Sequence, residues 1–209
     1  MFRDRGEAGE RLAASLVGRF ADERLVVLGI PRGGVLVAAP VADVLHAPLD
    51  VVVPRKLGAP DNPELAIGAI APGVRVLDER LLRSIGVPER YVEEEIARQE
   101  QEIHRRTERY RSGEAAVAIA GATAVIVDDG VATGATAIAA LRWARAQGAA
   151  RVVFAAPVGP RGTVRRLAQE ADEVVVLETP VSFAAVGEWY RSFDQVSDDE
   201  VIRALGRRA

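Results

Sequence analysis

The sequence predicts an α/β protein whose core is a doubly wound, mainly parallel sheet. Short apolar runs that suit strands alternate along the 209 residues with stretches of helical periodicity. The strand runs are continuously apolar, which is typical of parallel strands covered by helices on both faces. Because strands and helices alternate and the length suits one domain, a single α/β unit is expected.

The N-terminal part is expected to supply one helix and the first two strands. Apolar side chains recur on one face of residues 5–20, as in an amphipathic helix. A buried strand is predicted over 25–30, followed by a Gly-rich turn and a helix that runs to about His46. A second strand is predicted over 49–53, and it ends at Pro54.

A long insertion separates the second strand from the third. Residues 57–115 begin with segments broken by proline and glycine, in which the runs 65–70 and 74–77 resemble strands. Two helical pieces follow, over 79–85 and 88–111. The longer helix carries a thin apolar stripe, which suits packing against one neighbour or against a second subunit.

The C-terminal half resumes the alternation of strands and helices. Its predicted elements are a strand over 124–127, a helix over 134–147, a strand over 151–157, a helix over 163–170 and a strand over 173–177. The tail from about 178 to 209 is rich in aromatic residues and is predicted to be partly helical. One domain over 1–209, with an insertion and a small C-terminal tail, accounts for these elements.

Composition excludes several classes of function. The sequence has no cysteine, which excludes disulfides, thiolate metal sites and cysteine nucleophiles. His46 and His104 lie far apart and share no metal-ligand spacing. A formal net charge of −3 gives no indication of nucleic-acid binding. The longest apolar region, 25–54, is interrupted by charges and prolines, and the charged N-terminus lacks an apolar core, so a cytoplasmic protein without a membrane span is expected.

Residues 124–137 contain the pattern on which the functional interpretation depends. An apolar strand ends in two carboxylates, Asp128 and Asp129, and a Gly/Thr-rich turn leads into an Ala-rich helix. The start of a helix carries unpaired N–H groups and partial positive charge, so this turn suits a phosphate group. Two adjacent acids suit sugar hydroxyls or a metal ion beside that phosphate. The alternative, a turn merely capped by Thr133 or Thr136, would not need both acids.

The same stretch resembles the phosphoribosyl-pyrophosphate (PRPP) signature of type I phosphoribosyltransferases. The glycine patterns of P-loop NTPases and of dinucleotide-binding folds are absent from the sequence. The resemblance implies that Asp128 and Asp129 are the catalytic acids that hold the ribose hydroxyls, and that the following turn wraps the 5-phosphate. The turn residues expected to bind PRPP are Gly130, Val131, Ala132, Thr133, Gly134, Ala135 and Thr136.

Two other strand ends carry residues that the resemblance assigns to PRPP. Arg32, Gly33 and Gly34 match the pyrophosphate loop of the family, and Arg55 and Lys56 match its basic pair after the second strand. Ligands of parallel sheets bind beyond the carboxyl ends of the strands, so the three clusters are expected to converge. The alternatives are a solvated Arg32 in a strand-to-helix turn and ordinary surface charge at Arg55 and Lys56.

The resemblance also assigns roles to the insertion and the tail. It implies a mobile flap over 57–115 and a small hood over 178–209, and Phe183, Trp189 and Tyr190 of the hood are candidates for stacking on a planar acceptor. Packing of these rings against the core is the alternative. The tail pattern Phe-x-x-Val-Gly-x-Trp-Tyr-x-x-Phe resembles a group of predicted bacterial phosphoribosyltransferases rather than the adenine, hypoxanthine-guanine, orotate or uracil enzymes. The acceptor is therefore left open.

The implied reaction is displacement at the anomeric carbon of PRPP by a nitrogen nucleophile, with release of pyrophosphate. Mg²⁺ is the expected cofactor, held mainly by substrate oxygens and water near Asp128 and Asp129 rather than by a protein cage. The expected partners are PRPP and a nitrogenous, nucleobase-like acceptor, without nucleic acid or membrane, and a homo-oligomer is an option. The alternatives are a non-catalytic sensor of PRPP or nucleotides on the same fold and a partner-binding protein that keeps the cradle.

Overall fold

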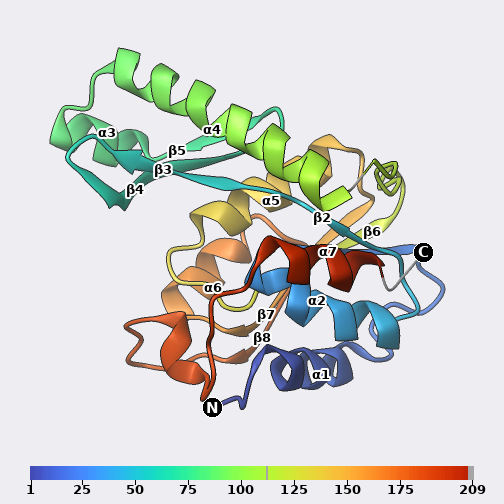
Figure 1. Cartoon of the computed structure of the whole chain (residues 1–209). Coiled ribbons are helices and arrows are strands. Elements are labelled where there is room, and N and C mark those ends of the chain that lie inside the picture. The colour runs from blue at the N-terminus through green and yellow to red at the C-terminus, as the bar shows by residue number, and fades with distance from the viewer. Residues whose placement is uncertain (112, 207–209) are drawn as a thin grey trace.

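The core of the protein is a five-stranded parallel sheet, as the sequence predicts. The computed structural model describes residues 1–111 and 113–206 (Figure 1). Neighbouring strands of this sheet follow the order β2–β1–β6–β7–β8, and every pair is parallel. The strands, in chain order, are β1 (Leu25–Gly29), β2 (Leu49–Val51), β6 (Thr123–Val127), β7 (Arg151–Val158) and β8 (Glu173–Glu178).

Helices cover both faces of this sheet, which explains why its strands are apolar throughout. Val27 and Val125 pack in a buried cluster with α1 (Arg5–Leu16) and α2 (Gly33–Val44). Val26 and Leu28 point to the other face and pack with α5 (Ala135–Ala146) and α6 (Arg161–Leu167). Successive residues of a strand face opposite sides, so both sets are buried. The predicted doubly wound α/β fold is confirmed.

Helix α1 is shorter than predicted. Asp4 caps its start by accepting a hydrogen bond from the Glu7 amide at 2.9 Å. The helix ends at Leu16 rather than Phe20, because Val17 leaves the helical conformation and Gly18 adopts a φ of +75°. Glycine tolerates this left-handed conformation, which turns the chain towards β1.

The insertion forms a separate three-stranded antiparallel sheet followed by two helices. Its elements are β3 (Arg55–Ala59), β4 (Asn62–Ala71), β5 (Val74–Leu77), α3 (Glu79–Ile85) and α4 (Glu89–Arg111). Strand β3 was not predicted, because its polar start is stabilised by pairing with β4, where Arg55 lies opposite Ile70. The thin apolar stripe of α4 packs within the same chain, in a cluster that includes Ile67 of β4 and Val201.

The tail returns to the start of the chain. It contains a short 3₁₀ helix (Val186–Trp189) and α7 (Asp198–Gly206), which packs against α2 and α4. Phe2 pairs with Tyr190 in a parallel bridge, and Figure 1 shows the N-terminus beside the orange-red tail. Within the described residues, no helix is long and apolar enough to cross a membrane.

Candidate functional site

The three predicted strand ends converge on one cavity of about 610 Å³. The cavity lies beyond the carboxyl ends of β1, β2 and β6, where parallel sheets bind ligands. Predicted site residues in its wall are Arg32, Gly33, Arg55, Lys56, Asp128, Asp129 and Thr136. The other residues predicted to bind PRPP, Gly34 and 130–135, lie outside this wall but next to it in the chain.

The two glycines that begin α2 let the helix start pack directly on the two acids. A Cβ on Gly33 would lie 1.8 Å from Oδ2 of Asp129, and a Cβ on Gly34 would lie 2.7 Å from the carbonyl oxygen of Val127. The peptide bond between Pro31 and Arg32 is cis. Both glycines are therefore explained by close packing, whether or not a ligand is bound.

Each acid uses one carboxylate oxygen within the protein. Oδ1 of Asp128 accepts a hydrogen bond from the Asp129 amide at 2.9 Å, and Oδ2 of Asp129 accepts one from Nε of Arg5 at 2.7 Å. Among residues 1–111 and 113–206, no hydrogen bond from a group outside the acid pair reaches Oδ2 of Asp128 or Oδ1 of Asp129, although the two carboxyl groups interact with each other. The acid pair therefore keeps two oxygens for hydroxyl donors or a cation.

Burial raises the pKa of both acids. The pKa of Asp128 lies well above its ordinary value because the side chain is desolvated and because the Asp129 carboxylate lies beside it. Burial also raises the pKa of Asp129, while the Arg5 guanidinium acts in the opposite direction. A ligand that brings hydroxyl donors or positive charge to this pair would relieve the repulsion.

The turn after the acids leaves most of its backbone amides without a hydrogen-bond acceptor in the described parts of the chain. Among the described residues no acceptor bonds the N–H groups of 132–136, whereas the Val131 amide donates to the Val158 carbonyl oxygen at 2.9 Å. Gly134 has a φ of +81° and precedes α5 without a side-chain cap, so neither threonine caps the helix. Five free amides at a helix start form the type of site that binds a phosphate.

Two residues of α6 donate hydrogen bonds to carbonyl oxygens of this turn. The Thr163 hydroxyl donates to the Ala132 carbonyl oxygen at 2.6 Å, and Arg166 donates to the Thr133 carbonyl oxygen. These bonds fix the carbonyls of the turn away from the amides. Neither residue was predicted from the sequence, since nothing in the local pattern connects α6 with a turn about 30 residues earlier.

The predicted basic residues differ in how they are bound. Arg55 donates from Nε to Oε1 of Gln99 in α4 at 2.8 Å, and burial next to Arg106 lowers its pKa. Nζ of Lys56 lies 3.1 Å from Oε2 of Glu64 in β4. The Arg32 guanidinium has no hydrogen-bond or ion-pair partner within the part of the chain that the structure describes. Arg32 is therefore the basic group that is free to meet an anion.

A family model described as "Phosphoribosyl transferase domain" matches residues 3–200. The chain belongs to the phosphoribosyl transferase family. Two curated proteins of Mycobacterium tuberculosis, from strains CDC 1551 / Oshkosh and H37Rv, are each 52% identical to this chain over 208 residues, and both are named "Putative phosphoribosyl transferase". These matches cover 99% of this chain and 47% of each relative, so the chain spans about half the length of those proteins.

A solved structure resembles this chain over its whole length. The crystal structure of the protein TT1426 from Thermus thermophilus is 47% identical to this chain, with a TM-score of 0.83. The match covers 100% of this chain and 99% of that one. This chain therefore shares its fold with that protein over the whole length of both.

The three aromatic residues predicted to stack on an acceptor do not line the cavity of this phosphoribosyl transferase fold. Tyr190 is buried between Phe2 and Phe193, with ring centroids 5.5 and 4.9 Å away, and its hydroxyl donates to the Asp129 carbonyl oxygen at 2.5 Å. Burial also raises its pKa. Phe183 and Trp189 lie outside the cavity wall as well. A stacking role for these three residues stays a prediction, and Phe193 is the aromatic residue in the wall.

Arg5 and residues 193–196 also line the cavity, and none of them was assigned to it from the sequence. Arg5 lies 124 positions before its partner Asp129, and no local pattern distinguishes it from the other arginines of the chain. Phe193 belongs to an aromatic pattern that was recognised, but the pattern does not indicate which ring faces the site.

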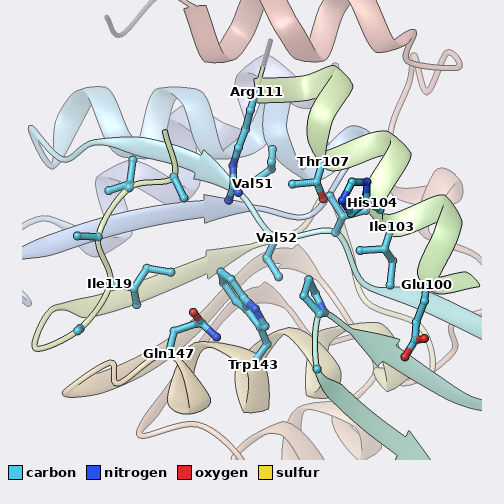
Figure 2. Close-up of a pocket in the computed structure, with 17 residues that line it drawn as sticks. Val51, Val52, Glu100, Ile103, His104, Thr107, Arg111, Ile119, Trp143 and Gln147 are labelled. Atoms are coloured by element: carbon cyan, nitrogen blue, oxygen red, sulfur yellow. The ribbon is translucent and has the colours of Figure 1, made fainter. Parts of the chain in front are cut away.

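A larger cavity of about 730 Å³ lies beneath α4 and contains none of the predicted site residues. Figure 2 shows Val52, Ile119 and Trp143 around it. Arg111 places a guanidinium in the wall of this cavity, but that group already forms an ion pair with Asp50 at 3.0 Å. A mainly apolar wall, whose one guanidinium among the described residues is already paired, suits a pyrophosphate less well than the smaller, charged cavity does.

Proposed function

We propose that the protein transfers the ribose 5-phosphate of PRPP to a nitrogenous, nucleobase-like acceptor and releases pyrophosphate. The observation that carries the proposal is that two carboxylate oxygens available at the cavity are followed directly in the chain by a turn with five free amides, of which Thr136 reaches the cavity wall. Ribose 5-phosphate has hydroxyl donors at one end and phosphate acceptors at the other, so it is complementary to both groups.

In this proposal the acids and the turn bind opposite ends of the sugar phosphate. The free oxygens of Asp128 and Asp129 accept the ribose 2- and 3-hydroxyls, and the amides of 132–136 bind the 5-phosphate. Thr136, which lines the cavity, adds a hydroxyl donor at the start of α5. The sugar is thereby held at a fixed orientation before the reaction.

The basic residues would bind the leaving group. Arg32 offers a free, planar guanidinium that can bind two phosphate oxygens at once. Arg55 and Lys56 line the same cavity, although their present partners, Gln99 and Glu64, lie in the flap over 57–115. Exchange of those contacts for pyrophosphate would couple substrate binding to the position of the flap.

The donor set fits a Mg²⁺ ion that the substrate brings with it. No group of three histidine, aspartate or glutamate residues in the described ranges forms a metal cage. The two free carboxylate oxygens of Asp128 and Asp129 nevertheless suit a hard cation that keeps most of its ligands from water and diphosphate. When bound, Mg²⁺ would neutralise charge on the pyrophosphate.

The chemical step needs little covalent chemistry from the protein. A nitrogen lone pair of the acceptor forms the bond to the anomeric carbon as the bond to the pyrophosphate oxygen breaks, pyrophosphate leaves with that bonding pair, and the acceptor nitrogen releases its proton to water or to the departing pyrophosphate. Positive charge develops on the sugar ring, and the carboxylates of Asp128 and Asp129 stabilise it. The hood over 178–209, with Phe193 in the cavity wall, would frame the acceptor.

Release of pyrophosphate from PRPP across a panel of nucleobases and amines tests the proposal. We expect release with one class of acceptor, and its loss in Asp128→Asn. If PRPP binds and raises the melting temperature but no acceptor in a broad panel gives release, the protein is a PRPP sensor rather than an enzyme. If PRPP does not bind at millimolar concentration, the site assignment itself is wrong.

A further inference from the structure

Arg5 contacts three separate parts of the proposed sugar site. Its Nε donates to Oδ2 of Asp129 at 2.7 Å, and its Nη1 donates to the Asp194 carbonyl oxygen at 2.8 Å. Its guanidinium also lies 3.9 Å from the centre of the Phe193 ring. The Arg5 and Asp129 side chains are 12% and 16% exposed, so this ion pair is well shielded from solvent.

The N-terminal segment that carries Arg5 is bound to the hood. The Phe2 amide donates to the Trp189 carbonyl oxygen at 2.7 Å, and the Arg191 amide donates to the Phe2 carbonyl oxygen at 2.9 Å. The Ser192 amide donates in turn to the Arg3 carbonyl oxygen at 2.9 Å. Residues 2–5 and the hood therefore form one layer beside the acid pair.

Close packing restricts the Arg5–Asp129 pair to one arrangement. A Cβ on Gly33 would lie 2.7 Å from Nε of Arg5 as well as 1.8 Å from Oδ2 of Asp129, so α2 closes the space on one side. The Asp129 carbonyl oxygen is held separately by the Tyr190 hydroxyl. Both the carboxylate and the backbone of Asp129 thus depend on the N-terminal segment and the hood.

We propose that Arg5 is a positioning residue of the sugar site, which fixes the Asp129 carboxylate so that its second oxygen is available to a ribose hydroxyl. The inference rests on the proposed function. Because the same guanidinium binds Asp194 and covers Phe193, the orientation of Asp129 also depends on the hood that frames the acceptor. The N-terminal segment becomes part of the substrate site without contacting the phosphate turn.

The chemistry of the site explains why this residue is an arginine. A guanidinium donates from Nε and Nη1 in a fixed geometry while its flat face packs on an aromatic ring. A lysine at this position keeps the positive charge but carries its donors on one nitrogen and lacks the flat face that packs on Phe193. Arg5→Lys should therefore restore part of the function that a neutral side chain loses.

Arg11 provides a matched control on the same helix. Its guanidinium lies 4.6 Å from the centre of the Phe2 ring, and it pairs with Glu178 at 3.4 Å, with both side chains more than a third exposed. It therefore makes the same kinds of contact as Arg5 but does not contact the acid pair. A change that merely loosens α1 or the N-terminal layer should appear in both arginine variants.

The test compares ribose 5-phosphate with inorganic phosphate as probes of the intact protein. Calorimetry on Arg5→Met should show at least tenfold weaker binding of ribose 5-phosphate and of Mg²⁺-PRPP, with inorganic phosphate bound within about twofold of the parent protein. The affinity of Arg5→Lys for ribose 5-phosphate and Mg²⁺-PRPP should lie between those of Arg5→Met and the parent protein. Arg11→Met should bind all three ligands as the parent protein does. Ethylguanidinium added to Arg5→Ala should restore part of the sugar-phosphate affinity.

Several outcomes would overturn the inference and can be told apart. Unchanged ribose 5-phosphate binding in Arg5→Met, with binding lost in Asp128→Asn, refutes the role of Arg5 and leaves the proposed function standing. Equal losses for ribose 5-phosphate and inorganic phosphate, or equal losses in Arg11→Met, identify a structural effect instead. Absence of PRPP and ribose 5-phosphate binding in the parent protein refutes the proposed function and the inference with it. If Arg5→Met fails to fold, Arg5→Lys and the ethylguanidinium rescue decide the question.

Discussion

Gly33→Ala is expected to disable the acid pair while leaving the fold intact. The new Cβ would lie 1.8 Å from Oδ2 of Asp129, a separation that no pair of non-bonded atoms tolerates, so the carboxylate must rotate away. Rotation breaks the 2.7 Å hydrogen bond between Oδ2 of Asp129 and Nε of Arg5. The Arg5 and Asp129 side chains are only 12% and 16% exposed. Loss of such a charge-assisted bond costs about 1.5–3 kcal/mol.

The predicted loss can be measured as a change in melting temperature and in ligand response. At roughly 2–4 °C per kcal/mol for a chain of this size, the melting temperature should fall by about 3–12 °C. Addition of Mg²⁺-PRPP should no longer raise it, because the displaced carboxylate cannot bind the sugar. Calorimetric scans with and without PRPP give both values.

Gly162→Ala is the matched control for this substitution. A Cβ on Gly162 would meet nothing within 4 Å, and the residue lies inside α6. Alanine should therefore stabilise the protein by up to about 1 kcal/mol, the opposite sign to Gly33→Ala. If Gly33→Ala melts at the parent temperature and still responds to PRPP, Asp129 does not lie against α2 and the geometry proposed for the sugar site is wrong.

Three further predictions test the acids, the turn and the flap. The raised pKa of Asp128 means that its ionised form destabilises the folded state above the unfolded-state pKa, so Asp128→Asn should raise the melting temperature at pH 7 and abolish the response to PRPP. Thr163→Val removes the 2.6 Å bond to the Ala132 carbonyl; it should cost about 1 kcal/mol by urea unfolding and weaken phosphate binding. Hydrogen bonds from Arg105 and Arg106 lower the pKa of Glu102 to about 2. The ionised Glu102 carboxylate therefore stabilises the folded state fully above its ordinary pKa of 4.5, and this stabilisation is lost as the pH falls towards 2. Glu102→Gln should therefore be less stable by under about 1 kcal/mol at pH 7, and the difference should vanish in acid.

Features encoded within a short stretch of chain could be predicted from the sequence. The apolar strand, the acid pair and the Gly/Thr turn of 124–137 are contiguous, so their placement at the carboxyl end of β6 followed from local periodicity. Convergence of Arg32 and Arg55 with Asp128 followed from the geometry of a parallel sheet, and the shared cavity confirms that they lie together.

Features created by distant pairing could not be predicted. Strand β3 has no apolar alternation and exists because β4 provides its hydrogen-bonding partner. The basic pair therefore lies inside this strand and not in a free loop, with Arg55 bound to Gln99 of α4. Arg5 and Phe193 meet in the structure although 188 positions (193 minus 5) separate them in the sequence, and only the fold brings them together.

The charges of the cavity explain why a ligand should complete this structure. Two part-buried carboxylates lie side by side with Arg5 as the one cation that contacts them among the described residues, and the free guanidinium of Arg32 lines the same cavity. Neither group is balanced by the protein alone, and desolvation makes the imbalance of the acid pair costly. Direct pairing of Arg32 with the acids would remove the cost but would also fill the site. In the proposed function PRPP would resolve it differently, because its ribose hydroxyls would satisfy the carboxylates while its pyrophosphate would pair with the arginine, and binding would then stabilise the fold by neutralising both.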